Sequence, residues 1–563
     1  MADAFKKLIP IILLLILSFF AIEPLFHPGF FPMHDDTQVV RVDQMAKALR
    51  DGQFPVRWVA DLGYGYGYPI YNFYAPLPYY FGGLFVILGF DALTATKIMF
   101  GLAILASAIF MYLFAGRIWG KAGAFLSAIL YQYVPYHALD IYVRGAVGEF
   151  WAAAFMPLAF YGIYCAFATV NKKNQARLKD LNIAVIGFTG VILSHNISAM
   201  LIFLVAVLSL MLLILVKRKR TPVLLLLFIT GLSLALSAFF IVPAIFEMKL
   251  TNVGKIISGE FNFSDHFVFW DQLWNSAWGF AGSAKGRMDG MSFKIGKLHL
   301  IFALSGLIFV LARKRSKWFL DQNFKFSLYF LLLFLFSVFM TLELSKFVYD
   351  LLSFLVYIQY PWRFLIFTVF SVSVLGGGAV IFFREKTRWF ISFLLTIMVL
   401  FLNVKYFSPQ KYLNVQSSTY LGKQNIIWQT SKISDEYLPK NFPVPENEEG
   451  AAKEKFIFDN PVYILKEMAR TQIYKLEVLA EKTTFVKINT AYFPKWQLIL
   501  DGRKVPFEIA GGVMEFVLPA GKHELTVVFE DTAIRKIANL ISLLSLPLLF
   551  DKIRRKLLPF IYG

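Results

Sequence analysis

The stretch Phe31-Pro32-Met33-His34-Asp35-Asp36-Thr37 follows closely on the first apolar run of the chain, which ends near Ala21. One histidine and two adjacent carboxylates therefore stand just beyond the point where a membrane helix would leave the bilayer. Charged groups so close to a membrane are costly unless they have a partner or a function. This juncture of membrane and acidic sequence is the first candidate for a functional site.

The composition predicts a membrane protein. Of the 563 residues, 58% are hydrophobic and 17% are charged, with a mean hydropathy of +0.59, whereas soluble domains carry about 25% charge. The net charge of +19 lies mostly in short clusters between apolar runs, which fits membrane topology better than a nucleic-acid partner. The single cysteine, Cys165, excludes an intrachain disulfide framework and a cysteine-based zinc site.

Apolar runs of membrane-spanning length recur along the chain. Backbone groups in lipid must find hydrogen-bond partners within their own segment, so the spans must be helices. We expect a mainly α, polytopic protein with about twelve transmembrane helices. They are placed near residues 8–22, 97–115, 121–135, 149–168, 181–197, 198–216, 222–246, 298–312, 325–342, 362–383, 387–404 and 534–550.

Basic clusters in alternate loops predict the sidedness. They include Arg117 with Lys121, the runs 172–179, 217–220 and 313–317, Arg384 to Arg388, and 552–556. The positive-inside rule places these loops and both termini in the cytoplasm, with the protein in the inner (plasma) membrane. The apolar runs 76–90 and 347–357 would invert this alternation if they spanned, so we expect them to be re-entrant or to lie in the membrane plane.

The domain organisation follows from the change in composition after residue 404. Residues 1–404 form the predicted transmembrane domain, with a first outer loop at 23–96, and residues 534–563 form a last helix and a basic tail. Between them, 405–533 carry alternating strand patterns. Asp501-Gly502 predicts one hairpin, and Pro519-Ala-Gly521, between 513–518 and 524–529, predicts a second. We expect an antiparallel β-sandwich outside the membrane.

Two features of the first outer loop have a membrane interpretation. Residues 37–49 carry apolar side chains at helical spacing, which is typical of an amphipathic helix lying on the membrane. The loop Gly63-Tyr-Gly-Tyr-Gly-Tyr-Pro69 has two interpretations. We favour an aromatic anchor at the membrane interface over a set of rings that stack on a sugar.

Asp35 and Asp36 allow two interpretations. One Asp at the start of a helix accepts backbone N–H groups and faces the positive end of the helix dipole. Alternatively, a carboxylate here acts as the base that removes a proton from an attacking hydroxyl or amine. Adjacent side chains do not point the same way, so only one of the two would be the base, and Asp36 is slightly preferred. The other would cap the helix or orient its neighbour. His34 is a candidate substrate-binding residue beside them.

A second acidic place lies in the loop with His137, Asp140, Arg144 and Glu149. Either Glu149 forms an ion pair with Arg144, or Glu149 faces Asp36 across a cavity while Arg144 binds a phosphate. His137 is a further candidate substrate-binding residue.

Three more residues are candidate substrate ligands. His195, in Ser194-His195-Asn196, either caps a helix junction or binds substrate. Arg363 either reaches lipid headgroups or grips a phosphate bidentately, and Arg57 is a weaker candidate. Asp35, Asp36, Glu149 and His195 are also possible divalent-metal ligands, although the sequence does not require a metal. The chain has no DxD, no HExxH and no Gly-rich phosphate loop, which disfavours nucleotide-sugar chemistry.

Four short stretches resemble a bacterial branch of membrane proteins labelled as 6-pyruvoyl-tetrahydropterin-synthase-related. They are His34-Asp-Asp36, Tyr71-Asn-Phe-Tyr-Ala-Pro76, Arg144-Gly-Ala-Val-Gly-Glu149 and Pro361-Trp-Arg363. Residues 496–529 resemble the outer domain of YfhO-type proteins. An acidic pair after the first span, an acidic residue after the third and an outer β-domain together resemble the GT-C-type membrane glycosyltransferases.

The resemblance implies a specific activity. It implies transfer of a sugar from a polyprenyl-phosphate-linked donor to an extracytoplasmic glycan, lipid or protein acceptor. Asp35 or Asp36 would be the general base or a metal ligand, and Glu149 corresponds loosely to the second acidic position. Two other classes stay open: a lipid or polysaccharide transporter or flippase, which would need paired charges midway through several spans, and a non-catalytic scaffold whose β-domain binds glycans.

Overall fold

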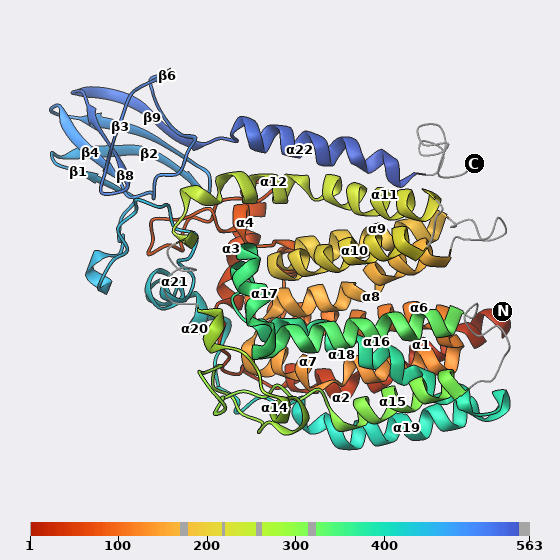
Figure 1. Ribbon diagram of the computed structural model, residues 1–563. Helices are drawn as coiled ribbons and strands as arrows, with labels where there is room; N and C mark the ends of the chain where they lie inside the picture. Colours follow the sequence, from red (N-terminus) through yellow and green to blue (C-terminus); the bar gives the residue numbers. More distant parts are fainter. Residues whose placement is uncertain (1, 169–177, 217–219, 255–261, 313–321, 551–563) are drawn as a thin grey trace.

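The computed structural model consists of a long helical bundle with a β-sandwich at one end (Figure 1). It describes residues 2–168, 178–216, 220–254, 262–312 and 322–550. The mainly α fold class is confirmed, and each predicted span contains helix. The principal helices are α1 (Ala2–Leu17), α6 (Ala92–Gln132), α8 (Val147–Ala168), α9 (Leu178–Ser194), α10 (Asn196–Val216), α11 (Arg220–Leu236), α12 (Ala238–Glu247), α15 (Lys297–Ala312), α16 (Gln322–Thr341), α18 (Leu365–Gly376), α19 (Arg388–Asn403) and α22 (Ala533–Ser545).

Helix α6 is a hairpin of two antiparallel arms. Gly120 leaves the helical conformation at φ 69° and ψ −176°, in the region that favours glycine. The Gln132 amide nitrogen lies 3.4 Å from the Ile104 carbonyl oxygen, although 28 residues separate them. In one continuous helix they would be about 42 Å apart. The two arms correspond to the two predicted spans at 97–115 and 121–135.

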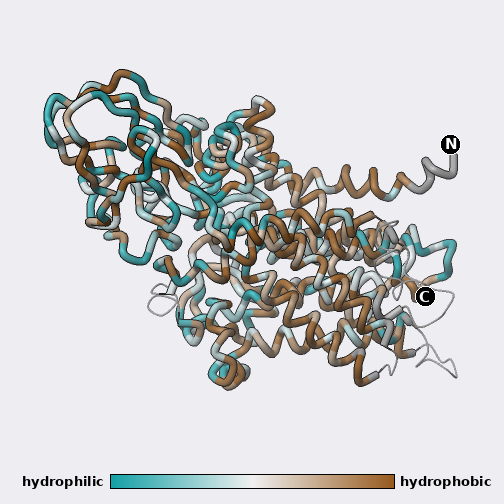
Figure 2. Tube along the Cα trace, turned by 90° about the horizontal axis from the view of Figure 1, so that it is seen from above, coloured by the Kyte–Doolittle hydropathy of each residue, from teal (hydrophilic) through white to brown (hydrophobic). Residues whose placement is uncertain are grey.

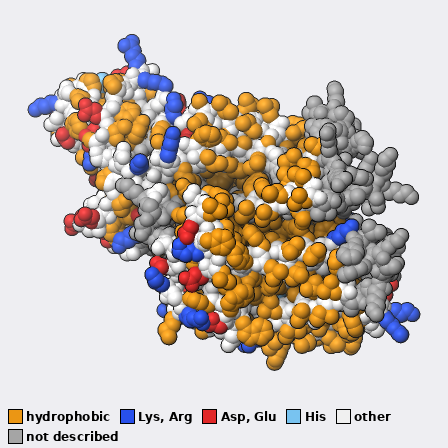
Figure 3. Space-filling model, in the orientation of Figure 1, with side chains coloured by type: hydrophobic (Ala, Val, Ile, Leu, Met, Phe, Trp, Pro, Cys, Tyr) orange, Lys and Arg blue, Asp and Glu red, His pale blue; other side chains and the backbone are white. Residues whose placement is uncertain are grey.

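Apolar side chains cover much of the visible face of the bundle, and hydrophilic residues gather in the sandwich and the loops beside it (Figures 2 and 3). Within the described residues, five segments are long and apolar enough to cross a membrane. A sixth is obtained if α11 and α12, bent by 75° at their junction, form one span. Four further apolar helices are shorter: Leu77–Ile87, Asp180–Ser194, Asn196–Leu212 and Lys297–Leu311. The number twelve stays a prediction.

Helix ends next to loops that were predicted to be cytoplasmic meet at the end of the bundle away from the sandwich. The Ser392 hydroxyl, near the start of α19, donates to the Ala122 carbonyl oxygen at 2.9 Å. The Asn182 amide, near the start of α9, donates to Leu549 at 3.1 Å, and α22 runs from the sandwich to this end (Figure 1). The basic clusters 172–179, 217–220, 313–317 and 552–556 lie wholly or mostly outside the described residues.

The first outer loop contains α3 (Gln38–Arg50), α4 (Ile70–Phe73) and α5 (Leu77–Ile87). Helix α3 forms where it was predicted, but it does not lie on a membrane surface with one face in water. Nine of its residues are buried, because α5 packs along it. Helix α5 spans about 16 Å, too short to cross a hydrocarbon core, as expected for a re-entrant or in-plane helix. The run 347–357 likewise forms only the short helices α17 (Lys346–Leu351) and η7 (Ser353–Ile358).

The C-terminal sheets form the predicted antiparallel sandwich, with strand orders β1-β4-β8-β7 and β2-β3-β9-β5-β6. Asp501-Gly502 makes the expected hairpin between β5 and β6. The second hairpin was wrong: β8 pairs with β4 and β7, whereas β9 pairs with β3 and β5, so the chain changes sheets at Pro519. The strands are β1 (Phe456–Phe458), β2 (Val462–Arg470), β3 (Ile473–Ala480), β4 (Thr484–Ile488), β5 (Trp496–Leu500), β6 (Arg503–Lys504), β7 (Glu508–Ala510), β8 (Val513–Leu518) and β9 (Gly521–Phe529).

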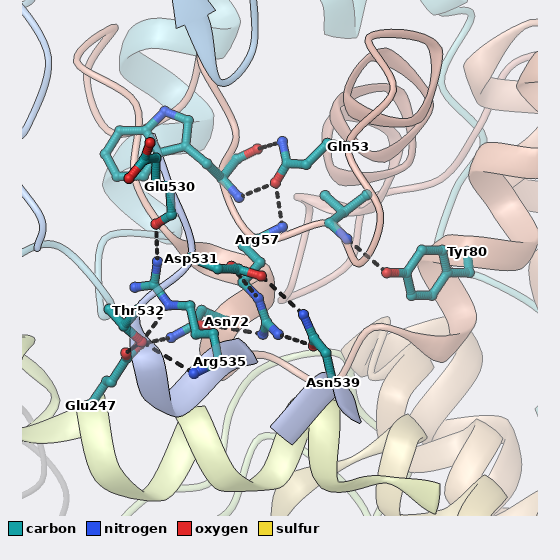
Figure 4. Close-up of polar contacts among 12 residues, drawn as sticks. Gln53, Arg57, Asn72, Tyr80, Glu247, Glu530, Asp531, Thr532, Arg535 and Asn539 are labelled. Carbon is teal, nitrogen blue, oxygen red and sulfur yellow. Dashed lines mark hydrogen bonds and ion pairs between the residues drawn. The ribbon is translucent and has the colours of Figure 1, made fainter. Parts of the chain in front are cut away.

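Two contacts fix the sandwich to the helical part. The buried Trp58 of the first outer loop packs on Trp496 and Phe529, with ring centres 5.1 and 5.2 Å away. Nearby, the Glu247 carboxylate at the end of α12 accepts hydrogen bonds from Arg535 at 2.9 Å and from Thr532 at 2.8 Å (Figure 4). We therefore expect the sandwich to have a fixed position over the first outer loop.

Candidate active site

A polar cavity of about 410 Å³ lies between the first outer loop, the helix ends and the chain that leads into the sandwich. It contains both cationic and anionic side chains. Its lining comes from six stretches of sequence: 35–41, 74–75, 144–149, 195–197, 359–363 and 432–437. Four of these six stretches contain candidate residues predicted from the sequence: Asp35, Arg144 with Glu149, His195 and Arg363.

Backbone hydrogen bonds hold Asp35 at the cavity. The N–H groups of His34 and Asp35 donate to the carbonyl oxygens of Val143 and Arg144, at 3.1 and 2.9 Å. The chain then turns at Gly145, with φ +66°, where a Cβ atom would lie 2.2 Å from the Met33 sulfur. Only glycine fits this conformation and this contact. The close approach of the two segments places Asp35 in the cavity lining.

Asp36 has a different environment from Asp35. It does not line the cavity, and burial raises the pKa of its carboxyl group to about 6. The N-cap of α3 is Thr37, without a side-chain capping bond, so neither aspartate is the N-cap residue. Among the described residues, neither carboxylate accepts a hydrogen bond. The geometry therefore favours Asp35 as the candidate base, because it lines the cavity, whereas the sequence slightly favoured Asp36.

Glu149 and Arg144 form the ion pair that was one of the two alternatives. The Arg144 guanidinium donates to Glu149 at 2.9 Å and also pairs with Asp140, which lies with Arg144 in the π-helical turn η2 (Asp140–Arg144). The Tyr136 hydroxyl donates to the other Glu149 oxygen at 2.6 Å. Arg363 approaches the same carboxylate at 3.8 Å. Glu149 thus has three polar neighbours, although it lines the cavity.

Arg363 lies in the cavity beside Arg144. Its guanidinium donates to the Ile358 carbonyl oxygen at 2.8 Å and to the Gln359 side chain at 2.7 Å. The guanidinium carbon of Arg144 lies 4.6 Å from the centre of the Trp362 ring, a favourable cation–π distance. Two guanidinium groups are therefore fixed in the cavity lining, where they could contribute positive charge to the binding of an anionic group.

His195 has the position expected of a residue that caps the helix junction, and its role in substrate binding stays a prediction. It lies at the junction of α9 and α10, with its Nδ1 atom 2.9 Å from the Ser198 hydroxyl, and it lines the cavity. The following residue, Asn196, donates its side-chain amide to the Phe73 carbonyl oxygen at 2.6 Å. These bonds attach the helix junction to the first outer loop.

Two predicted histidine ligands lie elsewhere. His34 is bonded through its Nε2 atom to the Phe280 carbonyl oxygen at 3.0 Å and does not line the cavity. His137 is fully buried between the rings of Tyr131 and Phe150, with ring centres 4.5 and 5.1 Å away. Helical packing, rather than a ligand site, explains the position of His137.

Arg57 is also outside the cavity. It is buried at the sandwich junction, where its guanidinium donates to Asn72 at 3.1 Å and to Asn539 at 2.8 Å (Figure 4). It also lies 3.4 Å from Asp531. Burial lowers the pKa of Arg57. This residue joins the first outer loop to α22, and its predicted role in substrate binding does not fit its position.

The sequence analysis missed one wall of the cavity, the roof segment at residues 431–437. This segment contributes Lys432, Asp435 and Glu436 to the lining. Arg41 of α3 donates to the Ser434 hydroxyl at 2.6 Å and lies 3.4 Å from Glu436. No local pattern marks these residues, because their partners are almost 400 positions away in the sequence.

The Gly-Tyr loop at 63–69 holds the roof segment. The Tyr64 backbone N–H and hydroxyl donate to Ser431 and Asp435, at 3.0 and 3.2 Å. The Tyr68 hydroxyl lies 2.5 Å from the Ser434 hydroxyl. Tyr64 and Tyr68 are buried, and neither lines the cavity. The loop therefore packs inside the protein, unlike either an interfacial anchor or a sugar-stacking platform.

An apolar groove of about 460 Å³ continues from the cavity. Most of its lining comes from α10 and α12, and four residues line both spaces: Asn196, Ile197, Gln359 and Tyr437. Polar side chains are few here, whereas the cavity is rich in charge. The two spaces together would accommodate a molecule with a polar head and an apolar tail.

The residues proposed as metal ligands do not form a ligand set. Within the described ranges, no three His, Cys, Asp or Glu side chains are grouped so that they could hold a metal ion. Asp35, Asp36, Glu149 and His195 therefore do not converge on one point in this arrangement.

Comparison with known proteins gives a family match over part of the chain. Residues 71–262 match the 6-pyruvoyl-tetrahydropterin synthase related domain, described as a membrane protein. An uncharacterised protein of Lactococcus lactis subsp. cremoris (strain MG1363) is 24% identical over 331 residues, 57% of this chain and 51% of the relative. The chain thus spans about half the length of this curated relative.

Solved structures give weaker likenesses. The mycobacterial arabinofuranosyltransferase AftD is 13% identical with a TM-score of 0.45, covering 72% of this chain and 27% of AftD. The Archaeoglobus fulgidus oligosaccharyltransferase is 14% identical with a TM-score of 0.46, covering 80% of this chain and 61% of that protein. The motifs Tyr71 to Pro76 and Arg144 to Glu149 fall within the matched region. The chain is thus a membrane protein by its apolar helices, and its residues 71–262 match the 6-pyruvoyl-tetrahydropterin synthase related domain that these two motifs resemble.

Proposed function

We propose that the protein is a membrane glycosyltransferase that moves a sugar from a polyprenyl-phosphate-linked donor to an extracytoplasmic acceptor. One observation carries this proposal: a cavity with an uncommitted carboxylate and two fixed guanidinium groups is continuous with an apolar groove between helices. This is the shape and charge that a lipid-linked phosphosugar requires. The resemblance of the sequence to GT-C-type enzymes points to the same activity.

The donor would lie with its polyprenyl chain in the apolar groove and its phosphate in the cavity. Gln359 lines both spaces and accepts a hydrogen bond from Arg363. The mouth of the groove is therefore beside Arg363, and the phosphate would meet Arg363 and Arg144 there. Arginine suits this role because its planar fork binds phosphate oxygens in pairs.

Asp35 is the proposed base by comparison with the other carboxylates in the cavity. Glu149 is bonded to Arg144 and Tyr136, Glu436 is paired with Arg41, and Asp435 accepts from Tyr64. The Asp35 carboxylate accepts no hydrogen bond from any described residue. Of these four carboxylates, Asp35 is the one best able to accept a proton from a substrate.

The proposed reaction is a single displacement with inversion at the anomeric carbon. The acceptor hydroxyl or amine attacks this carbon as Asp35 takes its proton, so the new glycosidic bond forms while the bond to the phosphate oxygen breaks. The electron pair of the broken bond stays on the phosphate. Arg363 and Arg144 stabilise that developing charge, which is the function of fixed cations at such sites.

The proposal includes a membrane orientation. The cavity and the sandwich would lie on the extracytoplasmic side of the inner (plasma) membrane, and both termini in the cytoplasm. The acceptor, a glycan, lipid or protein, would reach Asp35 from that side. Cysteine accessibility tests this orientation: with Cys165 replaced by Ser, a cysteine at Lys495 in the sandwich should react with an impermeant maleimide in intact cells, and one at Lys121 should not.

The activity test compares the two neighbouring aspartates in the full chain. Purified Asp35→Asn and Asp36→Asn variants are assayed with a panel of short-chain polyprenyl-phosphate-linked sugars and with membrane extracts as acceptor. We expect Asp35→Asn to lose about 10²- to 10⁴-fold in rate while it still binds polyprenyl phosphate, and Asp36→Asn to keep activity. Full activity in both variants would remove the base assignment. Lipid transport in vesicles that neither variant affects would favour a transporter instead.

A further inference from the structure

A second apolar groove lies on the flank of the bundle, at the outer ends of α15 and α16 under the short helix α14 (Trp270–Asn275). This flank groove has a volume of about 280 Å³ and is lined by apolar side chains alone, among them Trp274, Leu335 and Phe339. Leu335 and Trp270 are 52% and 63% exposed. It shares no lining residue with the groove beside the cavity.

A hollow of about 380 Å³ adjoins the flank groove; we call it the polar hollow for the three charged side chains among its eight lining residues, the other five being apolar. The two share Trp270, Leu342 and Leu344, and the polar hollow adds Asp271, Arg287 and Glu343. Charged side chains line the margin of the apolar surface on the visible face of the molecule (Figure 3). Tryptophan is typical of the boundary between hydrocarbon and headgroups, so an apolar groove here meets a polar hollow at headgroup level.

Arg287 is the cation of the polar hollow. It pairs with Asp271 at 2.8 Å, and its guanidinium carbon lies 4.5 Å from the centre of the Phe269 ring. The Arg287 and Asp271 side chains are both about two-thirds exposed. Asp271 and Glu343 contribute two negative charges and Arg287 one positive charge, so this hollow has a net charge of −1. Further negative charge is disfavoured there.

We propose that the flank groove and the polar hollow together bind one membrane phospholipid with an amine-bearing zwitterionic headgroup, such as phosphatidylethanolamine. One acyl chain fills the groove, the lipid phosphate meets Arg287, and the ammonium group faces Asp271 and Glu343. An anionic phosphatidylglycerol would bring a second net negative charge to the hollow without an ammonium group to offset it. This site is independent of the proposed transferase activity.

The test uses the full chain in nanodiscs of equal phosphatidylethanolamine and phosphatidylglycerol. After transfer to detergent, native mass spectrometry counts the phospholipids that stay bound. We expect phosphatidylethanolamine to exceed phosphatidylglycerol by about two- to five-fold, the range of an exposed ion pair. Leu335→Trp, which fills the groove, should lose one bound lipid. The matched control is Leu332→Trp, on the same helix and 49% exposed, but outside the groove.

A second variant addresses the headgroup. Glu343→Gln removes one of the two carboxylates that face the ammonium group, at an exposed position, which makes the hollow neutral. It should reduce the preference for phosphatidylethanolamine while the protein stays monodisperse. Equal lipid retention in Leu335→Trp and Leu332→Trp would overturn the proposal, as would a preference for phosphatidylglycerol. Because none of these residues lines the cavity, loss of the lipid is separable from loss of transferase activity.

Discussion

Glu247 offers a test of how the sandwich is held against the helices. Its carboxylate lies at the end of α12 and receives the Arg535 guanidinium at 2.9 Å. Asn72 and Thr532 each donate to it at 2.8 Å. The substitution Glu247→Gln keeps the volume of the side chain but removes its negative charge. The buried Arg535 cation then loses its closest counter-charge.

The expected loss of stability follows from the burial of the Glu247–Arg535 pair. The Arg535 and Glu247 side chains are 0% and 4% exposed, and removing one partner of a buried pair costs about 3–5 kcal/mol. At about 1.4 kcal/mol for each factor of ten, local opening of this junction becomes about 100- to 4000-fold more frequent. The exposed pair Lys346–Asp350, at 2.7 Å and half exposed, provides the contrast, because such a pair contributes about 0–1 kcal/mol.

The assay is hydrogen exchange of the α22 amides, followed by mass spectrometry in nanodiscs. Glu247→Gln should raise exchange in residues 533–545, and Asp350→Asn should leave it unchanged. The double substitution Glu247→Leu with Arg535→Met should recover part of the protection, since an apolar pair replaces a buried ion pair at little cost while the buried Asn72 amide loses its acceptor. Exchange in Glu247→Gln equal to that of the unmodified protein would refute this explanation of how α22 is held.

Three further predictions concern the cavity and the sandwich. Gly145→Ala should destabilise the protein by more than the roughly 1–2 kcal/mol of a positive φ, since its Cβ meets Met33. Gly511→Ala, at φ +56° with open space around it, should incur only the φ cost; equal thermal shifts in the two variants would contradict the Met33 contact. Trp58→Ala should loosen the sandwich by about 3–5 kcal/mol, measured as faster proteolysis between the helices and the sheets; unchanged cleavage would show that Trp58 does not hold it. Asp36→Asn should stabilise the protein at pH 7–8 and have no effect below pH 4. The raised pKa of about 6 means that ionised Asp36 disfavours the folded state above that pH, and this penalty disappears once both states are protonated. A thermal-unfolding series against pH checks this sign.

Features with a local cause were predictable from the sequence. Apolar runs predicted the helices, and the basic residues Arg117 and Lys121 predicted the break between the two arms of α6. Asp501-Gly502 predicted its hairpin because the turn type depends on those two residues alone. The Pro519 turn misled because its residues fit a hairpin, whereas hydrogen bonding to distant strands places β8 and β9 in different sheets.

Features that depend on distant contacts were not predictable. The choice between Asp35 and Asp36 depends on backbone bonds to Val143 and Arg144, which adjacent-residue patterns do not reveal. Arg57 was a weaker candidate substrate ligand, yet its partner Asn539 is 482 positions away. The roof segment carries no motif of its own. Its place in the cavity depends on hydrogen bonds to Arg41 and Tyr64, which are distant in the sequence.

The position of the roof segment in the chain has a consequence for biosynthesis. Asp35, Arg144 and Glu149 leave the ribosome early, but Lys432, Asp435 and Glu436 follow only after most of the protein has been translated. A chain interrupted before residue 425 would have the cavity floor without its cover, and water would reach the arginines freely. A prematurely terminated product should therefore insert into the bilayer yet lack the roof of this cavity.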